Sequence, residues 1–440
     1  MASPVLHIKD AYYFEVPKLL WPSHRADRND FPDVWVKLDP DFQLWEAQRL
    51  HEGLAGQPGL PAWPALRDEY LHWRESHDNF GKPLDVMLEE SDQQVRTDFA
   101  ATVEEAELAG KAAPSFEQYV EQTSPANAWF SLRMQDDSFR NTWADIKTTA
   151  GSVEAYSAEA SAWAPEKINA YNHALSGKIL IPQPFGELRN MYEPESGFCI
   201  SKFMVIELIV AAVLLLVFGW LGRKARSGAA PKGRVWNGLE IVLVYIRDNM
   251  ARPAIGAHDG DHYVPLLWTL FMFVLACNLC GLLPWVGSPT ASFGVTSGLA
   301  LAIFATSVVS GMRRFGFFGF FANQVPSMTL ALPLALVIKP MLLAIELLGF
   351  CIKHLVLAIR LLANMVAGHL VLLGVMGLAF GAVAALKFAA SPDWQWWLTA
   401  VISIVASTLF SCLELFVAFL QAYIFTFLSA LFIGAAIHHH

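Results

Sequence analysis

The distribution of apolar residues changes near residue 200, where long uninterrupted apolar runs replace short mixed segments. Residues 1–200 contain no apolar run approaching the length of about 18 residues at which a stretch is read as a candidate membrane helix. Residues 201–440 contain several such runs. The pattern therefore predicts a soluble N-terminal extension over 1–200 and a membrane domain over 201–440.

The first predicted membrane span is residues 203–222, whose helical length of about 30 Å matches the hydrocarbon core of a bilayer. Arginine and lysine residues follow it directly. Because positive loops stay on the side from which a protein is inserted, this loop is predicted on the matrix or cytoplasmic side and the extension on the other side. Apolar and polar positions at helical spacing predict an interfacial helix over about 234–250. Further spans are predicted over about 264–285 and 293–310.

The last part of the chain predicts two very long helices, because residues 341–391 and 394–437 contain no proline. Straight helices of these lengths would reach about 75 Å and 65 Å, well beyond the thickness of a membrane. They must be broken or steeply tilted, and a tilted pair needs a protein partner beside it. The predicted fold is an all-α integral membrane protein that ends in two long tilted helices, over about 336–390 and 394–437.

Charge divides the chain at the same place as hydropathy. Residues 1–200 hold 17 basic and 32 acidic residues, whereas residues 201–440 hold 14 and 8. The sparse charge of the second part excludes a wholly soluble enzyme, and the composition argues against nucleic acid as a partner. The extension holds eight of the 15 tryptophans, which favours an ordered domain of mixed helix and loop over a disordered tail. Within it, residues 91–113 predict a surface helix, and residues 21–35 and 56–70 predict aromatic-rich loops.

The five cysteines are too few and too scattered for a disulfide scaffold. Cys277 and Cys280 form a CxxC pair, but no second pair or nearby histidine completes a metal site. Packing within an apolar helix is the simpler interpretation of this pair. The sequence predicts no bound metal and no cofactor.

Ionisable residues recur within the penultimate apolar segment, where a buried charge costs about 2.5–3.5 kcal/mol even on the lenient insertion scale. At about 100° per residue, Glu346, Lys353 and Arg360 recur every seven positions and share one face of a helix. Asn364 extends that face, and His369 points to the opposite side. The helix is therefore predicted to present polar groups to two different neighbours.

In the last helix, Glu414 and Gln421 are seven residues apart and share a face. We predict that His369 pairs with Glu414, a site whose proton could move as the two pKa values shift against each other. Structural alternatives stay open for every residue. Arg360 could form an ion pair with Glu346, His369 and Glu414 could be structural groups, and the two amides could simply join helices.

Two segments carry a specific signature, RLLANMVAGH at residues 360–369 and LELFVAFLQAYIF at residues 413–425. Together they resemble subunit a of the F-type ATP synthases. The resemblance covers about residues 234–437. In the family's order it includes NGLEIVLVYIRD, YVPLLWTLFMFVLACNLCGLLPW, GMRRFGF and IELLGFCIKHLVLAIRL.

The resemblance implies a proton-translocating subunit that forms two half-channels against a ring of c subunits and is not catalytic alone. Arg360 would face the ring carboxylates, keep them ionised and prevent a proton short circuit. Asn364 would lie beside Arg360, and Glu346 would lie toward the opposite half-channel. The half-channel open to the positive side of the membrane would be lined by His369, Glu414 and Gln421.

The family also implies partners, namely the c-ring, other membrane and peripheral-stalk subunits, and membrane lipids such as cardiolipin. A permanently charged guanidinium favours a deprotonated carboxylate nearby, whereas an apolar lipid face favours a protonated one. Rotation of the ring would follow from that difference.

A histidine at position 369 with a glutamate at 414 resembles the mitochondrial members, since many bacterial members carry the acid and the histidine the other way round. This implies the mitochondrial inner membrane, with the extension in the intermembrane space. There the extension is predicted to bind lineage-specific subunits or to help hold synthase dimers together. The chain also departs from the family, because His354 stands where proline is common and Gly281 replaces an acid found in some bacterial members.

Three rival functions have less support from the sequence. A haem-binding electron carrier needs paired histidines on two membrane helices, whereas His354 and His369 lie deep in one apolar segment. A structural scaffold that has lost its channel would not require the intact set of polar residues. Coupling to sodium instead of protons depends chiefly on ligands of the c subunit, which this chain does not contain.

Overall fold

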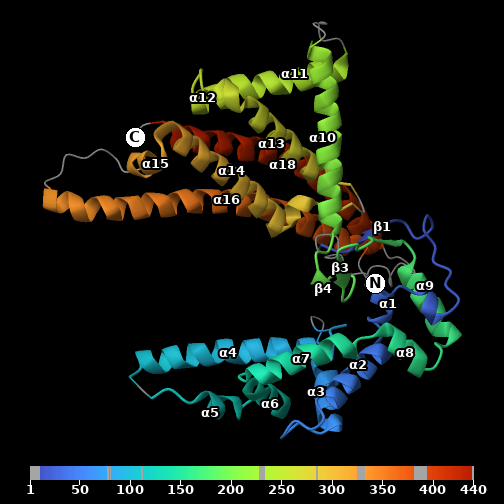
Figure 1. Cartoon of the computed structure of the whole chain (residues 1–440). Helices are drawn as coiled ribbons and strands as arrows, with labels where there is room; N and C mark the ends of the chain where they lie inside the picture. Colours follow the sequence, from blue (N-terminus) through green and yellow to red (C-terminus); the bar gives the residue numbers. More distant parts are fainter. Residues whose placement is uncertain are drawn as a thin grey trace. The chain divides into compact units, whose positions relative to one another are not determined.

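The structure, a computed structural model, describes residues 10–76, 79, 81–110, 112–226, 233–283, 286–324, 332–380 and 394–438. Most of the chain is helical, and short strands form two-stranded sheets (Figure 1). The chain divides into two compact units, which are described separately. The extension unit comprises Pro17–Lys178 and Gln183–Cys199, and the membrane unit comprises Met1–Val16, Ile179–Pro182 and Ile200–His440.

The extension unit is a helical domain completed by a β-hairpin. Its 3₁₀ and α-helices are η2 (Arg28–Asp30), α1 (Asp33–Val36), α2 (Pro40–Gly53), α3 (Trp63–Arg74), α4 (Leu84–Leu108), α5 (Phe116–Val120), α6 (Pro125–Arg133), α7 (Asp137–Ala150), α8 (Val153–Glu159) and α9 (Pro165–Leu175). The antiparallel hairpin is formed by β3 (Gly186–Leu188) and β4 (Pro194–Gly197).

Local sequence explains where these helices begin. Asp39 caps α2 by accepting a hydrogen bond from the backbone of Asp41, and Pro40 occupies the first turn, where its missing N–H costs nothing. The prediction of a loop over 56–70 is wrong in its second half, because α3 starts at Trp63 with a proline again in the first turn. The predicted surface helix over 91–113 lies within α4 as far as Leu108.

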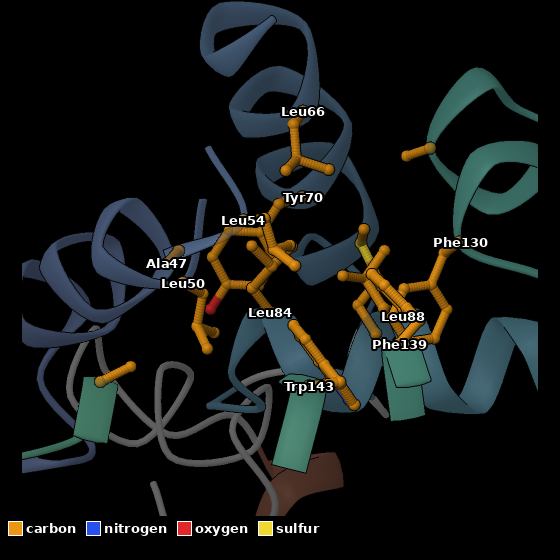
Figure 2. Close-up of a cluster of buried hydrophobic side chains, with 13 residues drawn as sticks. Ala47, Leu50, Leu54, Leu66, Tyr70, Leu84, Leu88, Phe130, Phe139 and Trp143 are labelled. Atoms are coloured by element: carbon orange, nitrogen blue, oxygen red, sulfur yellow. The ribbon is translucent and has the colours of Figure 1, made fainter. Parts of the chain in front are cut away.

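Aromatic and aliphatic side chains from five helices form the core of the extension unit (Figure 2). Phe130 is fully buried, and its ring lies 5.1 Å from that of Trp143 and 6.1 Å from that of Phe139. The hydroxyl of buried Tyr70 donates to the carbonyl of Lys82 at 3.0 Å, so its polar end is satisfied. Several of the tryptophans noted in the sequence thus pack inside or against the core of an ordered domain.

A partly buried carboxyl cluster lies between α2, α4 and the turn of the hairpin. Asp85, at the start of α4, forms an ion pair with Arg189, and Glu46 of α2 packs so closely that a Cβ on Gly151 would lie 2.6 Å from its Oε1. Burial raises the pKa of Glu46 to about 8, with the charge of Asp85 adding to the effect and Arg189 opposing it. Glu46 therefore holds a proton at neutral pH in the folded extension.

We expect the extension to lose stability as pH rises from about 4.5 to 8, because the unfolded chain releases the Glu46 proton over this range and the folded chain keeps it. The loss approaches about 1.4 kcal/mol per pH unit at most. Glu46→Gln should flatten this dependence, whereas Glu52→Gln, an exposed site on the same helix, should leave it unchanged. Denaturant unfolding of the full chain, followed by tryptophan fluorescence at several pH values, measures the effect. Parallel pH curves for wild type and Glu46→Gln would contradict it.

The membrane unit is a bundle of long apolar helices joined by short ones. Its elements are β1 (Tyr13–Glu15), β2 (Lys178–Leu180), α10 (Lys202–Arg226), α11 (Arg234–Ile246), the π-helix η4 (Arg247–Ala251), α12 (Arg252–Ile255), α13 (Gly260–Gly281), η5 (Pro289–Ala291), α14 (Phe293–Phe315), α15 (Phe317–Asn323), α16 (Leu332–Phe380) and α18 (Trp394–Ile437). Five helices in the described part of the chain, α10, α13, α14, α16 and α18, are long and apolar enough to cross a membrane.

The observed helices begin and end at residues that differ from the limits of the predicted spans. The second span was expected at about 264–285, but α13 runs from Gly260 to Gly281, because Pro265 is accommodated within its first turns. The third span, expected to end near 310, continues as α14 to Phe315 and stops at Gly316, whose φ of 75° suits glycine. The interfacial segment 234–250 forms α11 and continues into η4.

The last two helices, α16 and α18, lie side by side and dominate the bundle (Figure 1). α16 begins at Leu332, earlier than expected, and is described as far as Phe380, so the end of the predicted helix over 381–390 lies outside the described residues. α18 covers the predicted range 394–437. It packs against α13, α14 and α16, which makes it the central helix of the unit.

Candidate functional site

The site is built on the contact between α16 and α18. Leu357 and Leu361 of α16 are buried against Ala422 and Phe425 of α18 in an apolar cluster. Further along, His369 reaches Glu414, and the hydroxyl of Ser403 bonds to the backbone of α16. From one contact to the next, the residue number increases along α16 and decreases along α18, so the two helices are antiparallel.

The predicted pairing of His369 with Glu414 is present in the structure. The Nδ1 atom of His369 and the Oε1 atom of Glu414 form a hydrogen bond between α16 and α18. The side chains are 12% and 8% exposed, so few water molecules reach them. A histidine and a carboxylate that share a hydrogen bond in an apolar bundle form a group that can hold or pass on a single proton.

Gly368 makes room for this pair. A Cβ on Gly368 would lie 3.0 Å from Glu414 Oε1 and 3.4 Å from its Cδ, tighter than an ordinary van der Waals contact. A glycine beside His369 therefore lets the glutamate approach the backbone of α16. The role of Gly368 cannot be predicted from the sequence, because its contact with Glu414 depends on the neighbouring helix.

Arg360 is half-buried on α16 and has no hydrogen bond or ion pair within the part of the chain that the structure describes. The alternative of an ion pair with Glu346 is not what the structure contains, since Glu346 contacts Lys353 at 3.5 Å instead. Arg360 lies nine residues before His369. Because the helices are antiparallel and rise equally per residue, it lies near the level of Gln421, seven residues beyond Glu414.

The other predicted polar residues differ in exposure. Gln421 is buried at 6% exposure, and Asn364, one turn beyond Arg360, is partly buried. Glu346 and Lys353 lie at the half-exposed edge of α16, away from the His369 pair along the helix. The structure thus separates the predicted residues into one buried pair, one unpaired guanidinium and one more accessible ion pair.

The structure contains a buried network of hydroxyl and amide groups that the sequence pattern did not predict. Asn278 of α13 donates to the carbonyl of Ala418 at 3.3 Å and accepts from the hydroxyl of Thr290 at 2.7 Å. Thr290 also bonds to Ser288 at 2.8 Å. The three side chains are at most 1% exposed and reach α18 at Ala418, between Glu414 and Gln421. Asn278 inside an apolar run was the available sequence signal.

Gly281 and His354, the two positions that depart from the pattern that the sequence resembles, both pack closely against their neighbours. A Cβ on Gly281 would collide with Met365 and lie 2.5 Å from the Cβ of Ser288, so an acidic side chain does not fit there. His354, where proline is common, turns its Nδ1 toward the carbonyl of Phe350 at 2.8 Å and packs between aromatic rings. Neither residue contacts the His369 pair.

No group of three or more histidine, cysteine, aspartate or glutamate side chains among the described residues is arranged to hold a metal ion. Cys277 is buried in the α10–α13 contact, and its thiol is free, as are those of the other cysteines that the structure describes. The fold and the site instead define a multi-pass membrane protein with paired and unpaired ionisable groups between its helices, the class that moves ions across membranes.

Comparison with known proteins identifies the family. Residues 204–434 match the family described as ATP synthase A chain. The chain is 36% identical over 280 residues to ATP synthase subunit a of Chloroherpeton thalassium, a match that covers 62% of this chain and 78% of that protein. It is 35% identical over 244 residues to subunit a of Myxococcus xanthus, covering 55% and 75%, and 36% identical over 297 residues to that of Chlorobium phaeobacteroides, covering 66% and 81%.

This chain belongs to the ATP synthase A chain family. The predicted resemblance to subunit a and the predicted all-α membrane fold are confirmed. The relatives are bacterial, so the mitochondrial assignment stays a prediction.

Proposed function

We propose that this chain conducts protons through two half-channels that meet at Arg360, beside a ring of c subunits. As a subunit a, it is a proton-translocating membrane component of the ATP synthase and is not catalytic by itself. The observation that carries the residue assignment is the buried His369–Glu414 pair, nine residues along α16 from an arginine without a partner in the described chain.

Arg360 is proposed to act through its permanent charge. A guanidinium without an internal carboxylate partner is free to attract a carboxylate on another subunit. Near Arg360 such a carboxylate stays ionised, and away from it, against lipid, it takes up a proton. Because the arginine cannot give up its own proton, it blocks direct transfer between the half-channels, and each proton must travel around the ring.

His369, Glu414 and Gln421 are proposed to line the half-channel from the positive side of the membrane. A proton moves between the imidazole and the carboxylate along their hydrogen bond, and Gln421 continues the buried polar surface toward the level of Arg360. The network of Asn278, Thr290 and Ser288 supplies further donors and acceptors beside the same stretch of α18.

Glu346 is proposed to belong to the opposite half-channel, and Asn364 to lie beside Arg360 at the ring. Glu346 contacts Lys353 at 3.5 Å on the edge of α16, where the two ionisable side chains are 43% and 53% exposed. Glu346 and Lys353 share the face of α16 that carries Arg360. A proton released at Glu346 therefore has a polar route along this helix.

The experiment that tests this function is proton pumping driven by ATP hydrolysis in complexes that carry Arg360→Ala, with loss of pumping as the expected outcome. If this chain were a scaffold that has lost its channel, pumping by the complex would not depend on Arg360. Dependence of the pumping on sodium concentration would instead indicate the sodium-coupled alternative, for which no residue of this chain gives support.

We further propose that the partners are the c-ring, other membrane and peripheral-stalk subunits, membrane lipids such as cardiolipin and, for the extension, lineage-specific subunits. The mitochondrial inner membrane, with the extension in the intermembrane space, is the finer hypothesis. It rests on the order of His369 and Glu414 and on the basic end of α10. Fractionation of source cells, with protease access to the extension in sealed membranes, tests both the location and the side.

Removal of most of the extension should abolish dimers while leaving proton pumping intact, since the proposed pathway lies in the other unit. Residues 22–176 can be deleted cleanly, because Gly177 donates a backbone hydrogen bond to Trp21 at 2.8 Å and the new ends already meet. Native gel electrophoresis of the complex and a pumping assay measure the two effects. Unchanged dimers with unchanged subunit composition would remove the proposed role of the extension.

A further inference from the structure

Two adjoining cavities, of about 470 and 430 Å³, lie between the start of α13 and the end of α14. They share four lining residues, so they form one continuous groove, which we call the α13–α14 groove. The shared residues are His262, Tyr263, Ser310 and Arg313. His369 and Glu414 line neither cavity, so the groove is separate from the proposed proton pathway.

The groove carries an excess of positive charge. Arg314 at its rim is paired with Asp259 at 2.8 Å, and the nearby Asp261 is paired with Arg252 at 2.9 Å. Both carboxylates are therefore already neutralised. Arg313 lines both cavities and has no ion pair or hydrogen bond among the described residues, so its guanidinium is available to an anion.

Hydrogen-bond donors surround this free guanidinium. Two imidazoles, those of His258 and His262, and two hydroxyls, those of Tyr263 and Ser310, line the same groove. An arginine with hydroxyl and imidazole donors is a set that suits the oxygens of a phosphate group, which accept several charge-assisted hydrogen bonds at once.

The other wall of the groove is largely apolar, and the hydroxyl of Thr306, its polar member, donates to the carbonyl of Ala302 at 2.8 Å. Leu266 and Val309 are 37% and 46% exposed, and with Ala305 they line the cavity on the side that leads along α13 and α14 into the membrane. Arg313 and Arg314 occupy the last turn of α14, and arginines at the end of an apolar helix mark the membrane interface. The groove is thus polar at the interface and apolar toward the bilayer.

We propose that the α13–α14 groove binds the phosphate of an anionic phospholipid, with the headgroup on Arg313 and an acyl chain along the apolar wall. Basic pockets between membrane helices on the matrix or cytoplasmic side suit such headgroups. A free phosphate ion shares the polar chemistry but has no use for the apolar wall. The proposal assigns a place to the lipid partner, and it stands whether or not this chain conducts protons.

The test is lipid retention by the full chain in nanodiscs that contain phosphatidylcholine and phosphatidylglycerol, read by native mass spectrometry. Wild type should retain phosphatidylglycerol in preference to phosphatidylcholine. Arg313→Gln should weaken this retention about tenfold, the loss expected for one charge-assisted hydrogen bond. Arg226→Gln removes a basic residue at the end of α10 on the same side of the membrane and should leave retention unchanged.

A second groove variant and a phosphate titration complete the test. Ser310→Leu fills the groove without changing charge and should also release the lipid, so the proposal can be judged even if Arg313→Gln does not fold. Inorganic phosphate titrated into phosphatidylcholine nanodiscs that hold the full chain should not raise the melting temperature of the protein. Phosphate binding without lipid retention would overturn the lipid assignment, and equal retention by wild type and both groove variants would overturn the site.

Discussion

Replacing Arg360 by alanine should abolish proton pumping driven by ATP hydrolysis, whereas the complex should still assemble. A guanidinium about 4 Å from a ring carboxylate contributes about 4 kcal/mol at an effective dielectric constant near 20, equivalent to about three pKa units. Without it the carboxylate keeps its proton as it passes the stator, so the ring turns without releasing protons in the correct half-channel. Assembly is preserved because Arg360 has no partner among the described residues whose loss would unfold the bundle.

The measurement compares acidification of sealed vesicles by wild-type and variant complexes, alongside passive proton leak through the membrane sector. Arg223→Ala, which removes an exposed arginine from the last turn of α10, is the matched control and should pump normally. Pumping by Arg360→Ala at the wild-type rate would show that the family signature does not report the function of this chain. A scaffold without channel activity would then be the better interpretation.

The double variant His369→Glu with Glu414→His should preserve proton pumping. Either substitution alone should greatly reduce it. His369→Glu alone buries two carboxylates together, and Glu414→His alone buries two imidazoles, so each single variant loses the complementary pair. We expect each to reduce pumping about tenfold or more, as for removal of a general acid or base. The double variant restores one acid and one histidine across the same contact.

A double-mutant cycle on the pumping rate measures the coupling between the two positions. Ser411→Ala, one turn before Glu414, serves as the control for changes in α18, because among the described residues its hydroxyl donates to the carbonyl of Ser407 on the same helix and to no other group. If the double variant pumps no better than the worse single variant, the two side chains act separately. Full activity in both single variants would make the pair a structural contact.

The sequence predicted the membrane helices well because their signal is local. Twenty or so consecutive apolar residues bury their backbone polar groups in a helix whatever lies beside them. The boundaries were harder, since they depend on caps. Gly316 ends α14, and Pro64 lies in the first turn of α3, which begins at Trp63 where a loop was expected. Both effects come from backbone geometry at single residues.

The candidate site was predictable in part for the same reason. Helical periodicity placed Glu346, Lys353 and Arg360 on one face and His369 on the other, because spacing along one helix fixes direction. Periodicity does not say which residue of another helix lies opposite. The contact of His369 on α16 with Glu414 on α18 was therefore a hypothesis until the structure was known.

By itself, the sequence determined the helical membrane fold and the family, since these rest on periodicity and motif order. Only the tertiary structure decided which polar groups meet. The register between α16 and α18 brings His369 to Glu414, and the packing of α13 against α18 and of η5 against α13 buries Asn278 with Thr290. These contacts join residues 45 and 12 positions apart in the chain, and side-chain packing between helices, which no local pattern encodes, sets their geometry.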